Sequence, residues 1–321
     1  MENLTTKKYN SYIQHLSSML KINSDGSLVV VDLDGQVEQD FFKRIELNPF
    51  FNLINIIKTN TAKGTTLGLS VPMPSQTDTN TQERTPESGH ISPPQAFHCE
   101  QINLDSYISY QKLDSLAGVL DVDFNKAFED YFNRELFAGL LMVGWNGKNR
   151  ATTSDPKTHK LAEDVKKGWL QPIKEKRPNS IINGANVGEN QPYKSLSSLV
   201  KAGLEKIENP IKSSGDLIAI CGRNVLADYP IVSDISNPIM TVSQKQIGGL
   251  KAVNIAYFPE NSILITRLDN LSLYIQKGTI RKLLERNSMR NRLDVFTSLA
   301  LDFVIEDYNA VALIENINLV E

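Results

Sequence analysis

Two aspartates near the start of the chain could carry out chemistry. The segment VVVDLDGQV (29–37) places Asp32 and Asp34 at the end of an apolar run that is typical of a buried strand. Carboxylates at this spacing can share a magnesium ion, with Asp32 as nucleophile and Asp34 as general acid in the hydrolysis of a phosphate ester. The segment therefore indicates one candidate phosphatase site.

The same segment also has a purely structural interpretation. Asp34 is followed by a glycine, and Asp-Gly supplies the positive φ angles of a tight turn, so a β-hairpin fits equally well. The aspartates resemble the first motif of haloacid-dehalogenase-type phosphatases, which also use a lysine and a later acidic pair at strand ends. GDLIAIC (215–221) offers only Asp216, at the wrong end of its strand. We therefore favour the hairpin and keep a magnesium-dependent phosphatase using Asp32 and Asp34 as the alternative function.

Other groups of reactive side chains do not form a recognisable site. His90, His98 and Cys99 lie close together, but their spacing matches no tetrahedral zinc pattern, and Cys99 is expected to be a small buried hydrophobe. The glycine-rich segments 183–188 and 247–250 lack the strand–loop–helix order of a phosphate-binding loop. We expect no catalytic residue, no metal and no cofactor, and we do not expect an enzyme.

Positive charge gathers in RKLLERNSMRNR (281–292), which includes Arg281 and Arg286. The segment could contact phosphate, but Glu285 and neighbouring acidic residues favour a solvated face or a contact between subunits. Its pattern suggests a basic helix around 279–287.

The elements that must position these residues alternate irregularly between helix and strand. Apolar residues recur three or four positions apart over 4–20 and, most strongly, over 121–143, where Asp121 or Asp123 can cap the helix. Shorter helices are expected within 161–173 and over 195–208. Strands are expected at 102–110, 216–222, 250–256, 262–266 and 271–276, and at two C-terminal segments that meet at Tyr308-Asn309. The pattern predicts an α+β fold.

Composition excludes several classes of protein. The 321 residues are 40% hydrophobic and 22% charged, with a net charge of −3 from 34 basic and 37 acidic side chains, so no strong global field favours nucleic acid or membrane. No window is long and apolar enough for a membrane span, and the start does not resemble a signal peptide. Two cysteines do not make a disulfide framework, which indicates a reducing compartment where the chain is made.

One stretch does not fit a compact domain. Residues 70–95 contain five prolines, and their large apolar side chains are those of Val71, Met73 and Ile91. Such a segment cannot bury enough surface to offset the entropy of ordering it. A loop of this length inside a folded chain is expected to have a function, such as binding another molecule.

Six segments resemble landmarks of one group of phage proteins, the major capsid proteins of temperate contractile-tailed phages of the peduovirus, or P-two-like, type. They are QINLDSYISYQKLDSLA (101–117), GWNGKNRATTSD (144–155), VKKGWLQPI (165–173), CGRNVLADYPIV (221–232), SQKQIGGLKAVNIAYFPENSILITRLDNLSLY (243–274) and DFVIEDYNAVALIENI (302–317). They occur in order from about residue 95 onward, whereas the N-terminal quarter matches by layout more than by residues.

The resemblance implies the Hong Kong 97-type phage capsid fold. That fold has an N-terminal arm, an extended loop (E-loop), a peripheral domain with a long spine helix, and an axial domain. The expected division is 1–58 for the arm, 59–97 for the extended loop, 98–175 for the peripheral domain with spine helix 121–143, 176–294 for the axial domain, and 295–321 for C-terminal strands that return to the peripheral domain.

The resemblance also implies function and partners. We expect a protein that self-assembles, as hexamers and pentamers, into the icosahedral shell around the double-stranded DNA of a tailed phage, with only non-specific proximity to that DNA. Expected partners are a scaffolding or protease protein and the portal, with assembly in the host bacterial cytoplasm and final location in the virion. Candidate assembly-interface residues are Lys63, Glu83, Arg84, Glu87, Phe41, Phe42, Arg281 and Arg286. A possible N-terminal processing region is Asn23, Ser24, Asp25 and Gly26.

Overall fold

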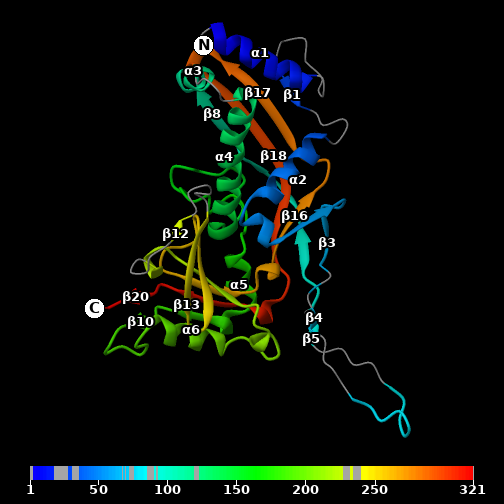
Figure 1. The fold of residues 1–321 in the computed structure, drawn as a ribbon, viewed down its shortest axis with the longest axis vertical. Coiled ribbons are helices and arrows are strands. Elements are labelled where there is room, and N and C mark those ends of the chain that lie inside the picture. The colour runs from blue at the N-terminus through cyan, green and yellow to red at the C-terminus, as the bar shows by residue number, and fades with distance from the viewer. Residues whose placement is uncertain are drawn as a thin grey trace.

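The computed structural model describes residues 3–17, 28–30, 36–66, 68, 70–71, 76–84, 90–91, 93–118, 123–226, 232–233 and 240–320. Within these residues the strands form two seven-stranded sheets and three two-stranded ladders, with helices packed against them (Figure 1). The helices are α1 (Asn3–Ser17), α2 (Gln36–Leu47), α3 (Tyr110–Gly118), α4 (Phe124–Asn146), α5 (Leu170–Lys176) and α6 (Leu196–Leu204).

The first sheet is organised around one long strand, β18 (Arg292–Ile305). One part of β18 pairs with β17 (Arg281–Asn287), and successive parts pair with β8 (Ser106–Ser109), β7 (Glu100–Asn103) and β16 (Leu271–Gln276). Two outer strands complete the sheet, β1 (Leu28–Val30) beside β17 and β2 (Asn55–Thr59) in parallel beside β16.

The second sheet has the order β12-β13-β14-β11-β15-β19-β9. Helix α6 packs on it through Leu199 and Val200, in a core cluster that also contains Ile265 and Ile314. The strands are β9 (Ile181–Asn183), β11 (Ile218–Cys221), β12 (Val232–Ser233), β13 (Met240–Ile247), β14 (Leu250–Ile255), β15 (Ile263–Thr266) and β19 (Ala312–Glu315), and the short strands β10 (Asn186–Val187) and β20 (Asn318–Leu319) form a separate ladder.

Helix α4 runs alongside the first sheet (Figure 1), and its start is fixed by a side-chain cap. The Asp123 carboxylate accepts hydrogen bonds from the backbone N–H groups of Asn125 and Lys126, which would otherwise lack a partner. The predicted helix over 121–143 is therefore found, three residues further along the chain. Its first three turns bury Phe124, Phe128 and Phe132, as the spacing of four predicts.

Those phenylalanines belong to a small core of their own. Phe128 is fully buried, and its ring lies 4.9 Å from that of Tyr12 in α1, in an edge-to-face arrangement. Leu284 and Val295, from β17 and β18, close the same cluster. We call this set of residues the α1 cluster, because it is what attaches helix α1 to the rest of the subunit.

The main core lies where α4 ends. The Trp145 and Trp169 rings are 4.8 Å apart and pack against Phe50 and Phe303. Gly144 makes this possible, because a Cβ there would come within 2.5 Å of the Trp169 ring. The aromatic cluster joins α4 to the first sheet.

Three local predictions are wrong. Residues 281–287 form strand β17, not a basic helix: the adjacent residues Leu283 and Leu284 point to opposite faces of the sheet, and β18 supplies the hydrogen-bond partners. Within 161–173 only the part from Leu170 is helical, because Gly168 must lie against the backbone of α4, where a Cβ would be 2.2 Å from a carbonyl oxygen. The hairpin over 29–37 is also wrong, because β1 pairs with β17 and helix α2 begins at Gln36.

The pairing also departs from the expected division of the chain. Strands β16 and β17 were expected within 176–294, yet they pair in the first sheet with β18. Strand β19 was expected to return to the peripheral domain with 295–321, yet it pairs with β15 and β9 in the second sheet. The chain therefore crosses between the sheets twice at one place, where the side chain of Asn270 exchanges hydrogen bonds with the backbone of Asp307.

Candidate assembly surfaces

The segment 59–97 forms an extended loop with a paired base. Strand β3 (Lys63–Thr65) pairs with β6 (Ala96–His98), and β4 (Ser70–Val71) pairs with β5 (His90–Ile91) further out. Beyond the β4–β5 ladder, residues 76–84 project away from the body of the subunit (Figure 1, cyan). Glu83 and Arg84 are exposed there and Lys63 is exposed at the base, whereas Glu87 lies outside the described residues.

The base of this loop rests on the first sheet through one aromatic contact. The Phe97 ring stacks on Tyr274 of β16 at 4.5 Å, and Gly64 in the opposite strand lies directly against the Phe97 ring. Cys99 and Val304 complete a small buried cluster on this face of the sheet. A single residue of β6 thus provides the apolar attachment of the loop.

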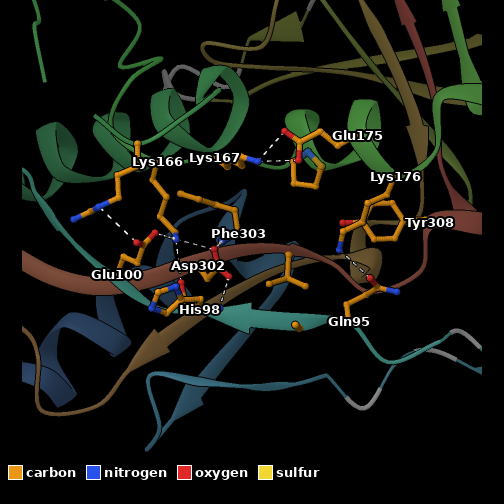
Figure 2. Close-up of a pocket in the computed structure, with 14 residues that line it drawn as sticks. Gln95, His98, Glu100, Lys166, Lys167, Glu175, Lys176, Asp302, Phe303 and Tyr308 are labelled. Atoms are coloured by element: carbon orange, nitrogen blue, oxygen red, sulfur yellow. Dashed lines mark hydrogen bonds and ion pairs between the residues drawn. The ribbon is translucent and has the colours of Figure 1, made fainter. Parts of the chain in front are cut away.

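A buried cation supports the other side of the same base (Figure 2). Lys166, which comes from the segment between α4 and α5, is only 4% exposed. Its Nζ lies 2.8 Å from Glu100 Oε2 and 3.0 Å from Asp302 Oδ1, and donates to the carbonyl oxygen of His98 at 3.0 Å. The backbone N–H of His98 in turn donates to Asp302 Oδ2 at 2.7 Å. We call Lys166, Glu100 and Asp302 the anchor cluster.

The pKa values of the two carboxylates in the anchor cluster are shifted in opposite directions. Burial raises the pKa of Asp302, and the opposing effect of Lys166 does not restore it to its usual range. Burial alone would also raise the pKa of Glu100, but the hydrogen bond and charge of Lys166, together with Arg150, hold that pKa below its usual value. Lys166 and Arg150 together outweigh the effect of burial on the pKa of Glu100, whereas Lys166 does not outweigh it for Asp302.

A cleft of 320 Å³ opens beside the anchor cluster. Its rim carries the exposed pair of Lys167 and Glu175, joined at 2.8 Å, and Lys176, whose Nζ donates to Gln95 Oε1 at 3.1 Å and lies 4.9 Å from the centre of the Tyr308 ring (Figure 2). Lys176 therefore adds a second link between the body of the subunit and the loop base.

Two of the expected interface residues are core residues instead. Phe41 and Phe42 of α2 are 8% and 4% exposed and belong to the main hydrophobic core. Lys58 of β2 lies over the Phe42 ring at 4.3 Å. Since both rings are covered within one subunit, they are not available to a neighbour, and that prediction is wrong for both.

The expected basic interface residues have different surroundings. Arg281 is exposed on β17, whereas Arg286 contacts helix α1 of its own subunit. Its guanidinium donates to Asn10 Oδ1 at 2.8 Å and lies 4.4 Å from the centre of the Tyr9 ring. Arg286 therefore helps to hold α1, and a role for either arginine between subunits stays a prediction.

The remaining candidates do not converge on a reactive site. Asp32 and Asp34, and the possible processing region Asn23, Ser24, Asp25 and Gly26, lie outside the described residues. Among the described residues, no group of three or more His, Cys, Asp or Glu side chains could hold a metal ion. In the same part of the chain, no helix is sufficiently long and apolar to cross a membrane.

A comparison with models of protein families identifies the family of this chain. Residues 8–317 match the model of the family described as "Phage major capsid protein, P2 family". The chain belongs to this family. It is a major capsid protein of a tailed phage, a subunit that assembles into the capsid shell, and the phosphatase alternative is not supported.

Individual relatives agree with the family. A protein named "Capsid proteins" from Escherichia phage P2 is 31% identical and covers 99% of this chain and 95% of its own length. The "Major capsid protein" of Serratia phage KSP20 is 26% identical, with coverages of 99% and 97%. A solved structure, "Satellite phage P4 procapsid including size determination (Sid) protein", matches with a TM-score of 0.75 and 31% identity over 100% of this chain and 99% of that chain.

A solved structure of lower sequence identity shares the same fold. The "Capsid of empty GTA particle computed with C5 symmetry" matches at a TM-score of 0.51 and 10% identity, over 82% of this chain and 87% of that chain. With the P4 procapsid, it places the capsid protein among the Hong Kong 97-like capsid folds, as the sequence motifs predicted.

Sequence reasoning missed the buried Lys166 and its two carboxylate partners. Lys166, Glu100 and Asp302 lie far apart in the chain, and Lys166 falls in a segment expected to be helical, whereas Asp302 falls in an apolar run typical of a strand. The only local signal is Asp302 itself, a charge within the apolar run LALDFVI (299–305). A charge at such a position is expected to have a buried partner.

Proposed function

We propose that the capsid protein forms the hexamers and pentamers of an icosahedral shell around double-stranded DNA, and that each extended loop (59–97) clamps a neighbouring subunit. The observation that carries this proposal is the position of residues 76–84, which project from the subunit with Glu83 and Arg84 exposed (Figure 1). The hydrogen bonds of that tip are local, from Asn80 and Thr81 to Asp78.

Length and composition support a contact with a neighbour. Thirteen residues on each side of an extended hairpin reach about 40 Å, enough to cross a neighbouring subunit. The tip is polar, so it contributes little to the stability of its own subunit, and its ordering energy has to come from whatever it binds. Many such contacts, each weak alone, make a closed shell stable through multivalency.

The test removes the tip and leaves the base intact. Replacing residues 72–89 with a short Gly-Ser linker keeps the β3–β6 ladder, the Phe97–Tyr274 stack and the anchor cluster. We expect an unchanged melting temperature and a loss of fast-sedimenting particles. A second variant replaces 76–84 with Gly-Ser of equal length, which keeps the reach of the loop and removes its side chains. Normal shells from the shortened variant would refute the clamp.

The family relationship supports further parts of the proposal. We propose that assembly takes place in the host bacterial cytoplasm with a scaffolding or protease protein and a portal, and that the packaged DNA is contacted without sequence preference. Processing at Asn23, Ser24, Asp25 and Gly26 would appear as a shortened N-terminus in the mass spectrum of particles. The capsid protein is proposed to have no enzymatic activity, so Asp32→Asn should leave both assembly and phosphate-ester hydrolysis unchanged.

A further inference from the structure

The base of the extended loop is held in an unusual way. Strands β3 and β6 pair with each other, and this two-stranded ladder is not part of either seven-stranded sheet. A ladder joined to a sheet shares a row of backbone hydrogen bonds with it, which fixes its direction. Strand β6 continues through Cys99 into β7 of the first sheet, so the loop is joined to that sheet by the chain but not by strand pairing.

Side chains take the place of that row of hydrogen bonds. Both backbone polar groups of His98, at the end of β6, are bound by the anchor cluster: the N–H donates to Asp302 and the carbonyl accepts from Lys166. The Phe97 ring, next to His98, lies on Tyr274 at 4.5 Å. A stacked ring allows rotation in its own plane, whereas two hydrogen bonds to one peptide segment do not.

Lys166 is the member that joins the parts together. It reaches His98 in β6, Glu100 in β7 and Asp302 in β18 from a fourth segment, so it connects the loop base with the first sheet and with the segment between α4 and α5. Without Lys166, Glu100 would keep Arg150, whose Nε lies 3.6 Å from its Oε1, but Asp302 would lose the ion pair that compensates for its partial burial. The carbonyl of His98 would lose its hydrogen bond at the same time.

Small changes at this base become large at the tip. Once the loop is extended along a neighbour, with a reach of about 40 Å, a rotation of about 10° at its base moves the tip by about 7 Å. We infer that Lys166 is a positioning residue for assembly, which sets the direction of the extended loop and thereby the angle at which neighbouring subunits meet. The consequence for the shell rests on the proposed clamp, whereas the effect on loop direction does not.

Loop direction can be measured in the unassembled full-length chain. Spin labels at Thr65→Cys on the loop base and Asn52→Cys on the body report one distance distribution by pulsed electron paramagnetic resonance. Both positions are exposed, and the native cysteines Cys99 and Cys221 are buried, so the labels attach selectively. The comparison is between Lys166→Met, which keeps a long unbranched side chain without its charge, and Lys167→Met, which removes an exposed neighbouring ion pair.

We expect Lys166→Met to shift or broaden the distribution measured at the loop base, because the hydrogen bond from Lys166 to the carbonyl of His98 is lost, and Lys167→Met to leave it unchanged. If Lys166→Met does not fold, Asp302→Asn is used in its place. This variant keeps an acceptor for the N–H of His98 but removes one negative charge, so we expect a smaller shift in the distance distribution. A distribution equal to that of Lys167→Met, in whichever variant folds, would overturn the inference.

Assembled particles give the second measurement. Lys166→Met shells should vary in diameter in electron micrographs, while Lys167→Met shells should match the unaltered protein. Uniform shells of normal diameter from Lys166→Met, formed despite a displaced loop, would overturn the link to the angle between subunits. This outcome is distinct from failure of the clamp itself, because the clamp is tested separately by the variant in which a short linker replaces residues 72–89.

Discussion

The α1 cluster offers the sharpest test of how the subunit is held together. Phe128 is fully buried at its centre, with ring contacts to Tyr12 at 4.9 Å and to Phe132 at 4.8 Å. Replacing a buried phenylalanine with alanine costs about 3–5 kcal/mol, because the apolar contact is lost and a cavity remains. We expect Phe128→Ala to reduce the free energy of unfolding by this amount.

The position of the cluster adds a local consequence. Tyr9 and Tyr12 are the buried aromatic side chains that attach α1 here, so losing Phe128 should release α1 before the main core unfolds. Hydrogen exchange resolved by mass spectrometry should therefore show faster exchange in residues 3–17, with little change in α6. Urea unfolding of the same samples supplies the free energy.

A matched control has the same chemistry at an exposed position. Phe296 on β18 is 39% exposed, so Phe296→Ala should cost far less than Phe128→Ala. If the two variants lost equal stability, or if α1 exchanged no faster in Phe128→Ala, the α1 cluster would not be the attachment described above.

Three further predictions concern the core and the anchor cluster. Gly144→Ala should lose about 1–3 kcal/mol in urea unfolding, because its Cβ would lie 2.5 Å from the Trp169 ring, whereas Gly118→Ala, with no atom within 4 Å, should lose nothing measurable. Cys99 and Cys221 should not react with a maleimide at pH 8 until the chain unfolds, because burial raises the pKa of each thiol to about 12; labelling of the native protein would contradict this. The lowered pKa of Glu100 means that its contribution to stability is present above the unfolded pKa of about 4.3 and is lost as pH falls through the folded pKa. Glu100→Gln should therefore be less stable than the unaltered chain at pH 7, and the difference should shrink as the pH is lowered.

The sequence predicted the elements whose signal is local. Helix α4 follows from the spacing of Phe124, Phe128 and Phe132, and strand β11 from a continuous apolar run. Residues 281–287 were misassigned because two adjacent leucines fit a helix as well as a strand, and only the pairing with β18 decides between them. That pairing depends on residues beyond the segment itself.

The assembly surfaces were predicted less well, for a related reason. Composition marks 70–95 as a segment with few apolar side chains, and within it Glu83 and Arg84 are exposed. Composition does not show whether a particular side chain is buried. Phe41 and Phe42 look like interface residues in isolation, and only the packing of α2 on β2 shows that they are covered. The anchor cluster depends on three segments meeting, which no local pattern encodes.

The pairing of β2 with β16 has a consequence for synthesis of the chain. Asn55 pairs with Ser272, and β18, which holds the first sheet together, ends at Ile305. The second sheet likewise needs β19, which ends at Glu315. Neither sheet can close until nearly the whole chain has left the ribosome, and such non-local pairing is slow to form. A nascent subunit therefore displays the loop base before β16 and β18, the strands of the first sheet that hold it, have formed.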